Sequence, residues 1–297
     1  MHQGGFIAIA FFAVVLGGPL LLGLAGLVSR RRRETGAPDA PWDWRLTLRS
    51  GLLYALAFNL VFFIQELFLV VPKALTPGLR PTLFHNNHRW EDDHPLASLF
   101  QGTGALAILL TGLIFAWLVR RGAGRSSNMR LFLIWMAYHG LVQSLPQIVV
   151  GAMVPQNDVG MAMDYLQMST GAKTAAALVA LALIPLVGIR LTRPLLELAG
   201  GGPSPTRRIF LIATLPAFAA IPVIILFRVP REVMEVVVPP IAVTVVGILW
   251  IQANAWRIRE ARPFPGPADG GIYGPLGLLI GLLLIFQLIL RPGIPFY

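Results

Sequence analysis

The sequence contains no cysteine, and this absence removes several kinds of chemistry. Without a thiol, the 297-residue chain forms no disulfide, carries no thiolate nucleophile and holds neither cysteine-ligated zinc nor an iron–sulfur cluster. A protein-bound metal ion would have to be held by His, Asp, Glu or Asn side chains. The redox compartment is left undecided.

Charged residues are also scarce. They make up 13% of the chain against 56% hydrophobic residues, and the mean hydropathy is +0.69. Such a chain is too apolar for a surface that faces water and is typical of a protein solvated by lipid. The net charge of +10 comes from arginines between apolar runs, where topology explains them without a polyanion. We therefore expect an integral membrane protein whose partner is the lipid bilayer and not nucleic acid.

Several catalytic signatures are missing from the sequence. It has no H-E-x-x-H motif of zinc proteases, no G-x-S-x-G motif of serine hydrolases and no phosphate-binding loop of ATP-driven proteins. The second and third histidine boxes of membrane desaturases and hydroxylases are missing as well. These absences argue against the best-known classes of membrane hydrolase, oxidase and ATPase.

Eight apolar segments approach the 20 residues or so that a bilayer core requires. They predict an all-α, polytopic helical bundle that forms a single membrane domain over residues 1-297. Gly277 and Gly281 form a GxxxG pair, a common helix-packing face. The expected spans are 5-29, 51-72, 96-119, 131-154, 171-190, 209-228, 236-253 and 273-291.

The distribution of basic residues predicts the orientation of these spans. If the N-terminus lies outside, the cytoplasmic loops contain 17 of the 24 Lys and Arg residues, beginning with the run Arg30 to Arg33. Every cytoplasmic loop then obeys the positive-inside rule. We expect a multi-pass protein of the plasma membrane with both termini on the non-cytoplasmic side.

Three of the five histidines fall within ten residues, at His85, His88 and His94. They lie in the loop 73-95, which the topology places outside. If residues 82-94 form a short interfacial helix, His85 and His88 share one face, and three imidazoles leave a coordination position open on a metal ion. Asp92 and Asp93 would bind the ion or orient the imidazoles. We expect a divalent transition metal, zinc first, with iron or copper as alternatives; the simpler alternative is a solvated loop whose histidines cap helices or bond to the backbone.

A second group of polar residues lies within the spans. Glu66 interrupts the second span, and His139 the fourth, so we expect this pair to act as general acid and base. The other side chains expected at the same cavity are Asn59, Gln65, Gln101, Gln143, Gln147, Asp158 and Asp164. For the amides, hydrogen bonding between helices is the competing interpretation.

Together these features predict a metal-dependent membrane enzyme, a hydrolase or oxidoreductase, that acts near the outer face. Two alternatives remain open. The first is a transporter or channel that uses Glu66 and His139, and the second is a non-catalytic subunit or assembly factor that joins other membrane subunits. Transport would require polar groups that continue to the cytoplasmic face.

Overall fold

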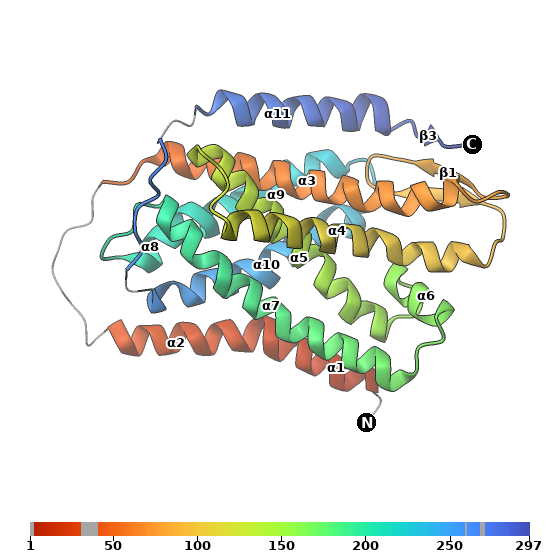
Figure 1. The fold of residues 1–297 in the computed structure, drawn as a ribbon, viewed down its shortest axis with the longest axis horizontal. Helices are drawn as coiled ribbons and strands as arrows, with labels where there is room; N and C mark the ends of the chain where they lie inside the picture. The colour runs from red at the N-terminus through yellow and green to blue at the C-terminus, as the bar shows by residue number, and fades with distance from the viewer. Residues whose placement is uncertain (1–2, 31–40, 259, 268–270) are drawn as a thin grey trace.

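A computed structural model of the chain describes residues 3–30, 41–258, 260–267 and 271–297 (Figure 1). The chain is 76% helical, and long helices lie side by side along one direction. Seven of them are long and apolar enough to cross a membrane. The expectation of an all-α membrane bundle is confirmed.

The long helices coincide with the eight apolar segments. Short π-helical stretches continue three of them without a break. The helices are α1 (Gln3–Phe12), η1 (Ala13–Gly17), α2 (Gly18–Arg30), α3 (Trp44–Ala74), α4 (Leu96–Arg120), α5 (Ser127–Met153), α6 (Asp158–Tyr165), α7 (Thr170–Leu198), α8 (Pro205–Ile209), η2 (Phe210–Thr214), α9 (Leu215–Arg228), α10 (Val233–Asn254), η3 (Ala255–Arg257), α11 (Tyr273–Leu284) and η4 (Ile285–Leu290).

Among the long helices of the described residues, α5 alone is not one of the seven apolar candidates. It packs against α3, α4, α7 and α10, and 18 of its 27 residues are buried. Because α5 is surrounded by protein and not by lipid, its sequence carries polar side chains on several successive turns. A long helix that carries several polar side chains therefore lies at the centre of the bundle.

Glycine brings α4 and α5 into close contact. A Cβ atom placed on Gly140 would lie 2.5 Å from the backbone of Gly112, so neither position accepts a larger side chain without displacing a helix. The GxxxG pair behaves differently, because a Cβ on Gly277 or Gly281 would meet nothing within 4 Å. Both glycines line an apolar groove of about 570 Å³ between α3, α5 and α11, so the packing role expected for them is not seen within the chain.

The loop after α3 forms a small β-sheet. The short interfacial helix considered for residues 82-94 is not formed. Strands β1 (Arg80–Leu83) and β2 (His88–Glu91) make an antiparallel hairpin, and β3 (Ile294–Pro295) from the end of the chain pairs with β1. The turn is closed because the Phe84 amide donates to the Asn87 carbonyl at 2.8 Å. In a strand alternate side chains share a face, so His88 points the same way as Trp90.

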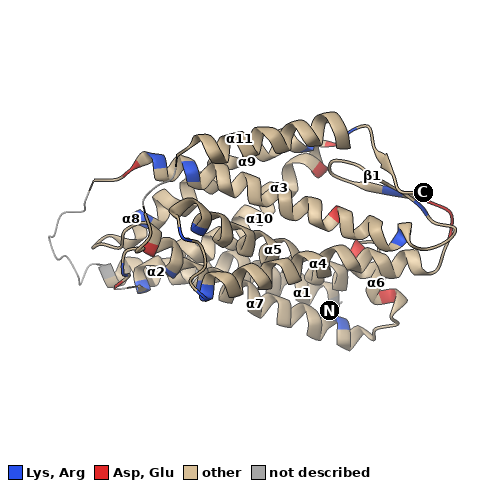
Figure 2. Cartoon of the chain, turned by 45° about the horizontal axis from the view of Figure 1, so that its top comes forward, with Lys and Arg blue, Asp and Glu red and all other residues tan. Residues whose placement is uncertain are grey.

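Charged residues gather at the two ends of the bundle and are sparse in the middle (Figure 2). The hairpin, α6, the start of α1 and the C-terminus lie toward one end, which we call the hairpin end (Figure 1). At the opposite end lie α8 and the connection between α4 and α5. The predicted arginine run falls largely on Arg31 to Arg33, which lie outside the described residues.

Candidate functional site

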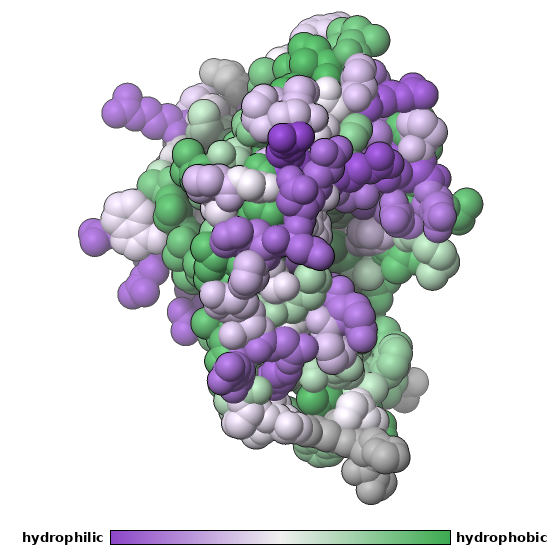
Figure 3. Space-filling model, turned by 90° about the vertical axis from the view of Figure 1, so that its right-hand side faces the viewer, coloured by the Kyte–Doolittle hydropathy of each residue, from purple (hydrophilic) through white to green (hydrophobic). Residues whose placement is uncertain are grey.

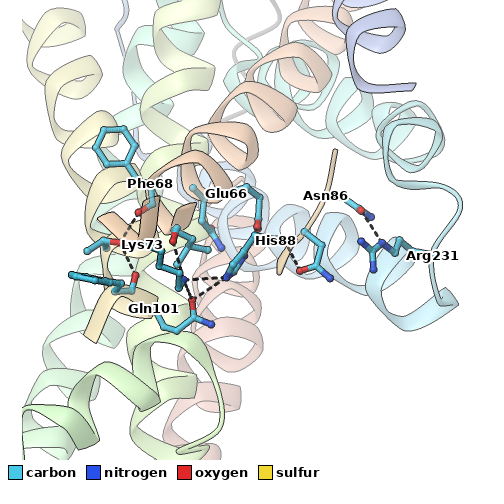
Figure 4. Close-up of polar contacts among 12 residues, drawn as sticks. Glu66, Phe68, Lys73, Asn86, His88, Gln101 and Arg231 are labelled. Carbon is cyan, nitrogen blue, oxygen red and sulfur yellow. Dashed lines mark hydrogen bonds and ion pairs between the residues drawn. The ribbon is translucent and has the colours of Figure 1, made fainter. Parts of the chain in front are cut away.

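A group of buried polar side chains lies beneath the hairpin, between α3, α4 and β2 (Figure 4). We call Glu66, Lys73, His88, Trp90 and Gln101 the polar cluster. Glu66 and Lys73 are seven residues apart on α3, about two turns, so they lie on one face of the helix. Gln101 comes from the second turn of α4, and β2 brings His88 and Trp90 over these groups.

A chain of short contacts joins the ionisable groups. The His88 Nδ1 atom lies 2.9 Å from Glu66 Oε2, and His88 Nε2 lies 3.0 Å from Gln101 Oε1. The Lys73 ammonium donates to Gln101 Oε1 and to the Leu69 carbonyl, each at 2.8 Å. Glu66 and His88 are only 5% and 9% exposed, so water screens their interaction weakly.

The contacts of His88 also define what its ring nitrogens face. Nδ1 faces the Glu66 carboxylate, whereas Nε2 lies near both Gln101 Oε1 and the Lys73 ammonium, the latter at 3.4 Å. With a proton on Nδ1, His88 donates to Glu66 whether the ring is neutral or charged, and the contact is an ion pair when the ring is an imidazolium.

Lys73 is completely buried and was not predicted as a site residue. Its ammonium lies 4.6 Å from the centre of the Trp90 ring, which stacks on His88 at 5.6 Å between ring centres. The ring face attracts the cation and covers the cluster from the hairpin side. The seven-residue spacing from Glu66 was the sequence signal that could have identified Lys73.

Asp158 lies at the edge of the cluster, at the first position of α6. Burial raises the pKa of its carboxyl, and repulsion from Glu66 raises it further, while His88 and Lys73 oppose the rise. Asp158 is therefore within electrostatic reach of Glu66, His88 and Lys73. Asp164, by contrast, forms an ion pair with Lys173 at the surface.

The three clustered histidines go to three different environments. His88 enters the polar cluster, His85 is buried in the hairpin turn, and His94 Nδ1 accepts the Leu96 amide at 3.2 Å where α4 begins. Asp92 and Asp93 are exposed. In the part of the chain that the structure describes, no three His, Asp or Glu side chains are arranged to hold a metal ion. The predicted transition-metal site at His85, His88 and His94 therefore stays a prediction.

His139 and Glu66 have different neighbours. The His139 ring is fully buried among Tyr54, Phe58 and Tyr138, with the Tyr54 ring centre 4.3 Å away. Neither of its ring nitrogens has a hydrogen-bond partner among the described residues. Glu66 bonds to His88 instead, so the structure provides no hydrogen bond that would make Glu66 and His139 an acid–base pair.

The predicted amides hold α3 and α5 together. Gln147 donates to Gln65 Oε1 at 2.8 Å, and Gln143 donates to the Phe58 carbonyl at 3.4 Å. Asn59 bonds within its own helix, to Ala55. These contacts are hydrogen bonds within and between membrane helices, which was the competing interpretation.

Polar contacts continue along α3 toward the opposite end. The Tyr54 hydroxyl lies 2.9 Å from Thr244 Oγ1, and the Trp135 indole donates to Ser50 at 3.1 Å. Nearer that end Arg49 donates to Ser127 at 3.0 Å. The sequence did not reveal this continuation, because a single tyrosine, tryptophan or serine in an apolar helix indicates side-chain packing and not a polar contact.

Comparisons with known proteins found no protein-family model, no curated protein and no solved structure that matches this chain.

Proposed function

We propose that the protein is a membrane transporter that takes up a proton at the Glu66–His88 pair. One observation supports this most strongly: a carboxylate on a candidate membrane helix contacts an imidazole at 2.9 Å, and both are buried. A carboxylate within the membrane is costly and commonly marks a proton or ion pathway. Imidazole is the side chain whose ordinary protonation change lies closest to neutral pH.

The groups around this pair suggest a route. Asp158 is partly exposed at the hairpin end, where it would exchange protons with water and with the pair. From there polar side chains recur along α3 and α5, through Gln65 and Gln147, to Arg49 at the opposite end. An enzyme confined to one face needs no such succession, whereas transport needs polar groups at every depth.

The metal-dependent hydrolase or oxidoreductase expected from the sequence has less support, because the three histidines lie apart. Within the described residues, no contact favours the non-catalytic subunit or assembly factor. Transport is therefore the function that accounts for most of the buried polar groups.

We further propose eight crossings, with the hairpin end outside and both termini on that side. The basic residues concentrated at the opposite end favour this orientation by the positive-inside rule (Figure 2). Because the chain has no native cysteine, single cysteines at Ala74 and Ser126 report on the two ends. An impermeant thiol reagent should label Ala74→Cys in intact cells, and preferential labelling of Ser126→Cys would reverse the orientation.

Proton flux tests the proposed function. The full chain is reconstituted into liposomes that contain a pH-sensitive dye, and an inward proton gradient is imposed with potassium and valinomycin to balance charge. We expect acidification faster than in empty liposomes, lost in Glu66→Gln and kept in Glu91→Gln. Glu91 is the matched control because it is an exposed glutamate on the same hairpin. Wild-type flux no faster than in empty liposomes, or equal flux in Glu66→Gln, would overturn the proposal.

A further inference from the structure

We propose that the hairpin end contains a binding site for a phosphate-type oxyanion, formed by His85, Arg228 and Arg231. We call these three residues and Asn86 the oxyanion site. The site lies beside the polar cluster, since the Glu66 carboxylate faces Arg228, but it includes none of the cluster's residues.

Arg228 supplies the first unused donor. The residue is 4% exposed at the end of α9, and its guanidinium lies 4.3 Å from the centre of the Phe62 ring. Its Nε and Nη2 atoms donate to the Glu235 carbonyl at 3.0 and 2.8 Å. Its Nη1 atom is buried and has no hydrogen-bond partner within the described residues. A buried unsatisfied guanidinium nitrogen is costly, and a bound anion would satisfy it.

His85 supplies the second donor of the oxyanion site. It is 3% exposed in the hairpin turn and its ring lies against the backbone carbonyls of Arg228 and Val229, although neither ring nitrogen makes a hydrogen bond of good geometry to a described residue. Burial lowers the pKa of His85, the Arg228 carbonyl opposes this shift, and the positive charges of Arg231 and Arg291 lower the pKa further. The neutral ring still offers one N–H donor.

Asn86 fixes these groups relative to one another. Its Nδ2 atom donates to the Arg228 carbonyl at 2.8 Å, and its Oδ1 atom accepts from Arg231 Nε at 3.1 Å (Figure 4). The hairpin turn is thereby tied to the segment that joins α9 to α10. Donors from two separate parts of the chain are held in place before any ligand arrives.

The local charge favours an anion. Arg228 and Arg231 lie together, and Arg291 lies within electrostatic reach of His85. Two carboxylates face Arg228, those of Glu66 and Glu235, but Glu66 is bonded to His88 and Glu235 is exposed. Forked guanidinium groups together with an imidazole N–H suit an oxyanion with several oxygens.

A phosphate group can reach the site from either of two sources, because of where the site lies. Hydrophilic residues gather on the surface of the hairpin end, where water and lipid headgroups would both have access (Figure 3). A free phosphate would enter from water, and an anionic lipid would place its headgroup phosphate there from the leaflet.

Binding to the intact protein tests the inference. The full chain is placed in nanodiscs of phosphatidylcholine, and inorganic phosphate is titrated against a chloride reference while the unfolding temperature is recorded. In a second arm phosphatidylglycerol replaces a quarter of the lipid, and retained lipid is counted by native mass spectrometry. We expect saturable stabilisation in the first arm or retention of one phosphatidylglycerol in the second, and each result identifies its source.

Arg231→Gln is the informative variant because Arg231 is half-buried, so its replacement leaves the packing of α9 intact. Affinity should fall roughly tenfold or more, the equivalent of one charge-assisted hydrogen bond. Arg80→Gln is the control, since it removes the same charge from an exposed position on β1 and should change affinity less than about twofold. Equal weakening in both variants, or no saturable binding of either probe to wild type, would overturn the site.

Discussion

Breaking the contact between Glu66 and His88 should reveal a large interaction energy. The test is a double-mutant cycle with Glu66→Gln, His88→Phe and the combination, in which Phe keeps the ring that stacks on Trp90. At a separation of about 4 Å and an effective dielectric constant of about 20, two unit charges attract by about 4 kcal/mol. Part of this is offset by the free-energy cost of burying them, and hydrogen bonds to charged groups retain about 1.5–3 kcal/mol.

We therefore expect each single variant to lower the free energy of unfolding by about 3–5 kcal/mol, because it leaves a buried charge without its partner. The double variant should cost about 1.5–3 kcal/mol less than the sum of the two. The assay is reversible unfolding from mixed micelles by a denaturing detergent, followed by tryptophan fluorescence and analysed where the transition is two-state.

A matched cycle serves as control. Arg80 and Glu91 face each other across the same hairpin but are exposed, so their interaction energy should be no more than about 1 kcal/mol. An interaction energy for Glu66 and His88 below about 0.5 kcal/mol would refute the argument.

Three further results are expected. His139→Leu should raise or preserve the unfolding temperature, because it removes a buried ring whose nitrogens make no hydrogen bond of good geometry to a described residue; a fall of several degrees would mean that this ring has a partner that stabilises the fold. Gly140→Val should abolish folded protein on size-exclusion chromatography while Gly277→Val is tolerated, since only the first glycine touches another helix; equal behaviour would contradict the packing. Asp158→Asn should gain stability relative to wild type as pH rises above about 3.9, the ordinary Asp pKa. The reason is that the pKa of Asp158 is raised in the folded state, so ionisation of the wild-type carboxyl disfavours the fold. A free energy of unfolding that increases in wild type relative to Asp158→Asn over this pH range would contradict the direction of the pKa shift.

Most of the fold could be predicted from the sequence because the bilayer imposes a local requirement. A span must be apolar over about 20 consecutive residues, and seven of the eight expected segments lie in described helices that have this property without reference to the rest of the chain. Segment 131-154 was identified in the same way although α5 is central. The hairpin could not be predicted from local sequence, since β1 is the middle strand and pairs with Ile294 and Pro295 at the far end of the chain.

The sequence points to several residues of the candidate site but not to which of them contact one another. Glu66, His88 and Gln101 were all named from the sequence, yet His88 was grouped with His85 and His94, and Glu66 with His139. Helical spacing suggested the first grouping, whereas the period of two in a strand turns His88 toward Trp90 and the bundle. The sequence does not reveal the burial of Lys73, because it depends on how α3, α4 and the hairpin come together.

Infrared difference spectroscopy tests the central claim, that Glu66 and His88 exchange a proton, most directly. The reconstituted protein is taken from roughly pH 4 to pH 9, a range that covers the ordinary titration of carboxylic acids and imidazoles. We predict a carboxyl band that changes with pH, is lost in Glu66→Gln, is kept in Glu91→Gln and changes together with an imidazole band that is lost in His88→Phe. A spectrum in which neither variant removes a pH-dependent band would contradict the account.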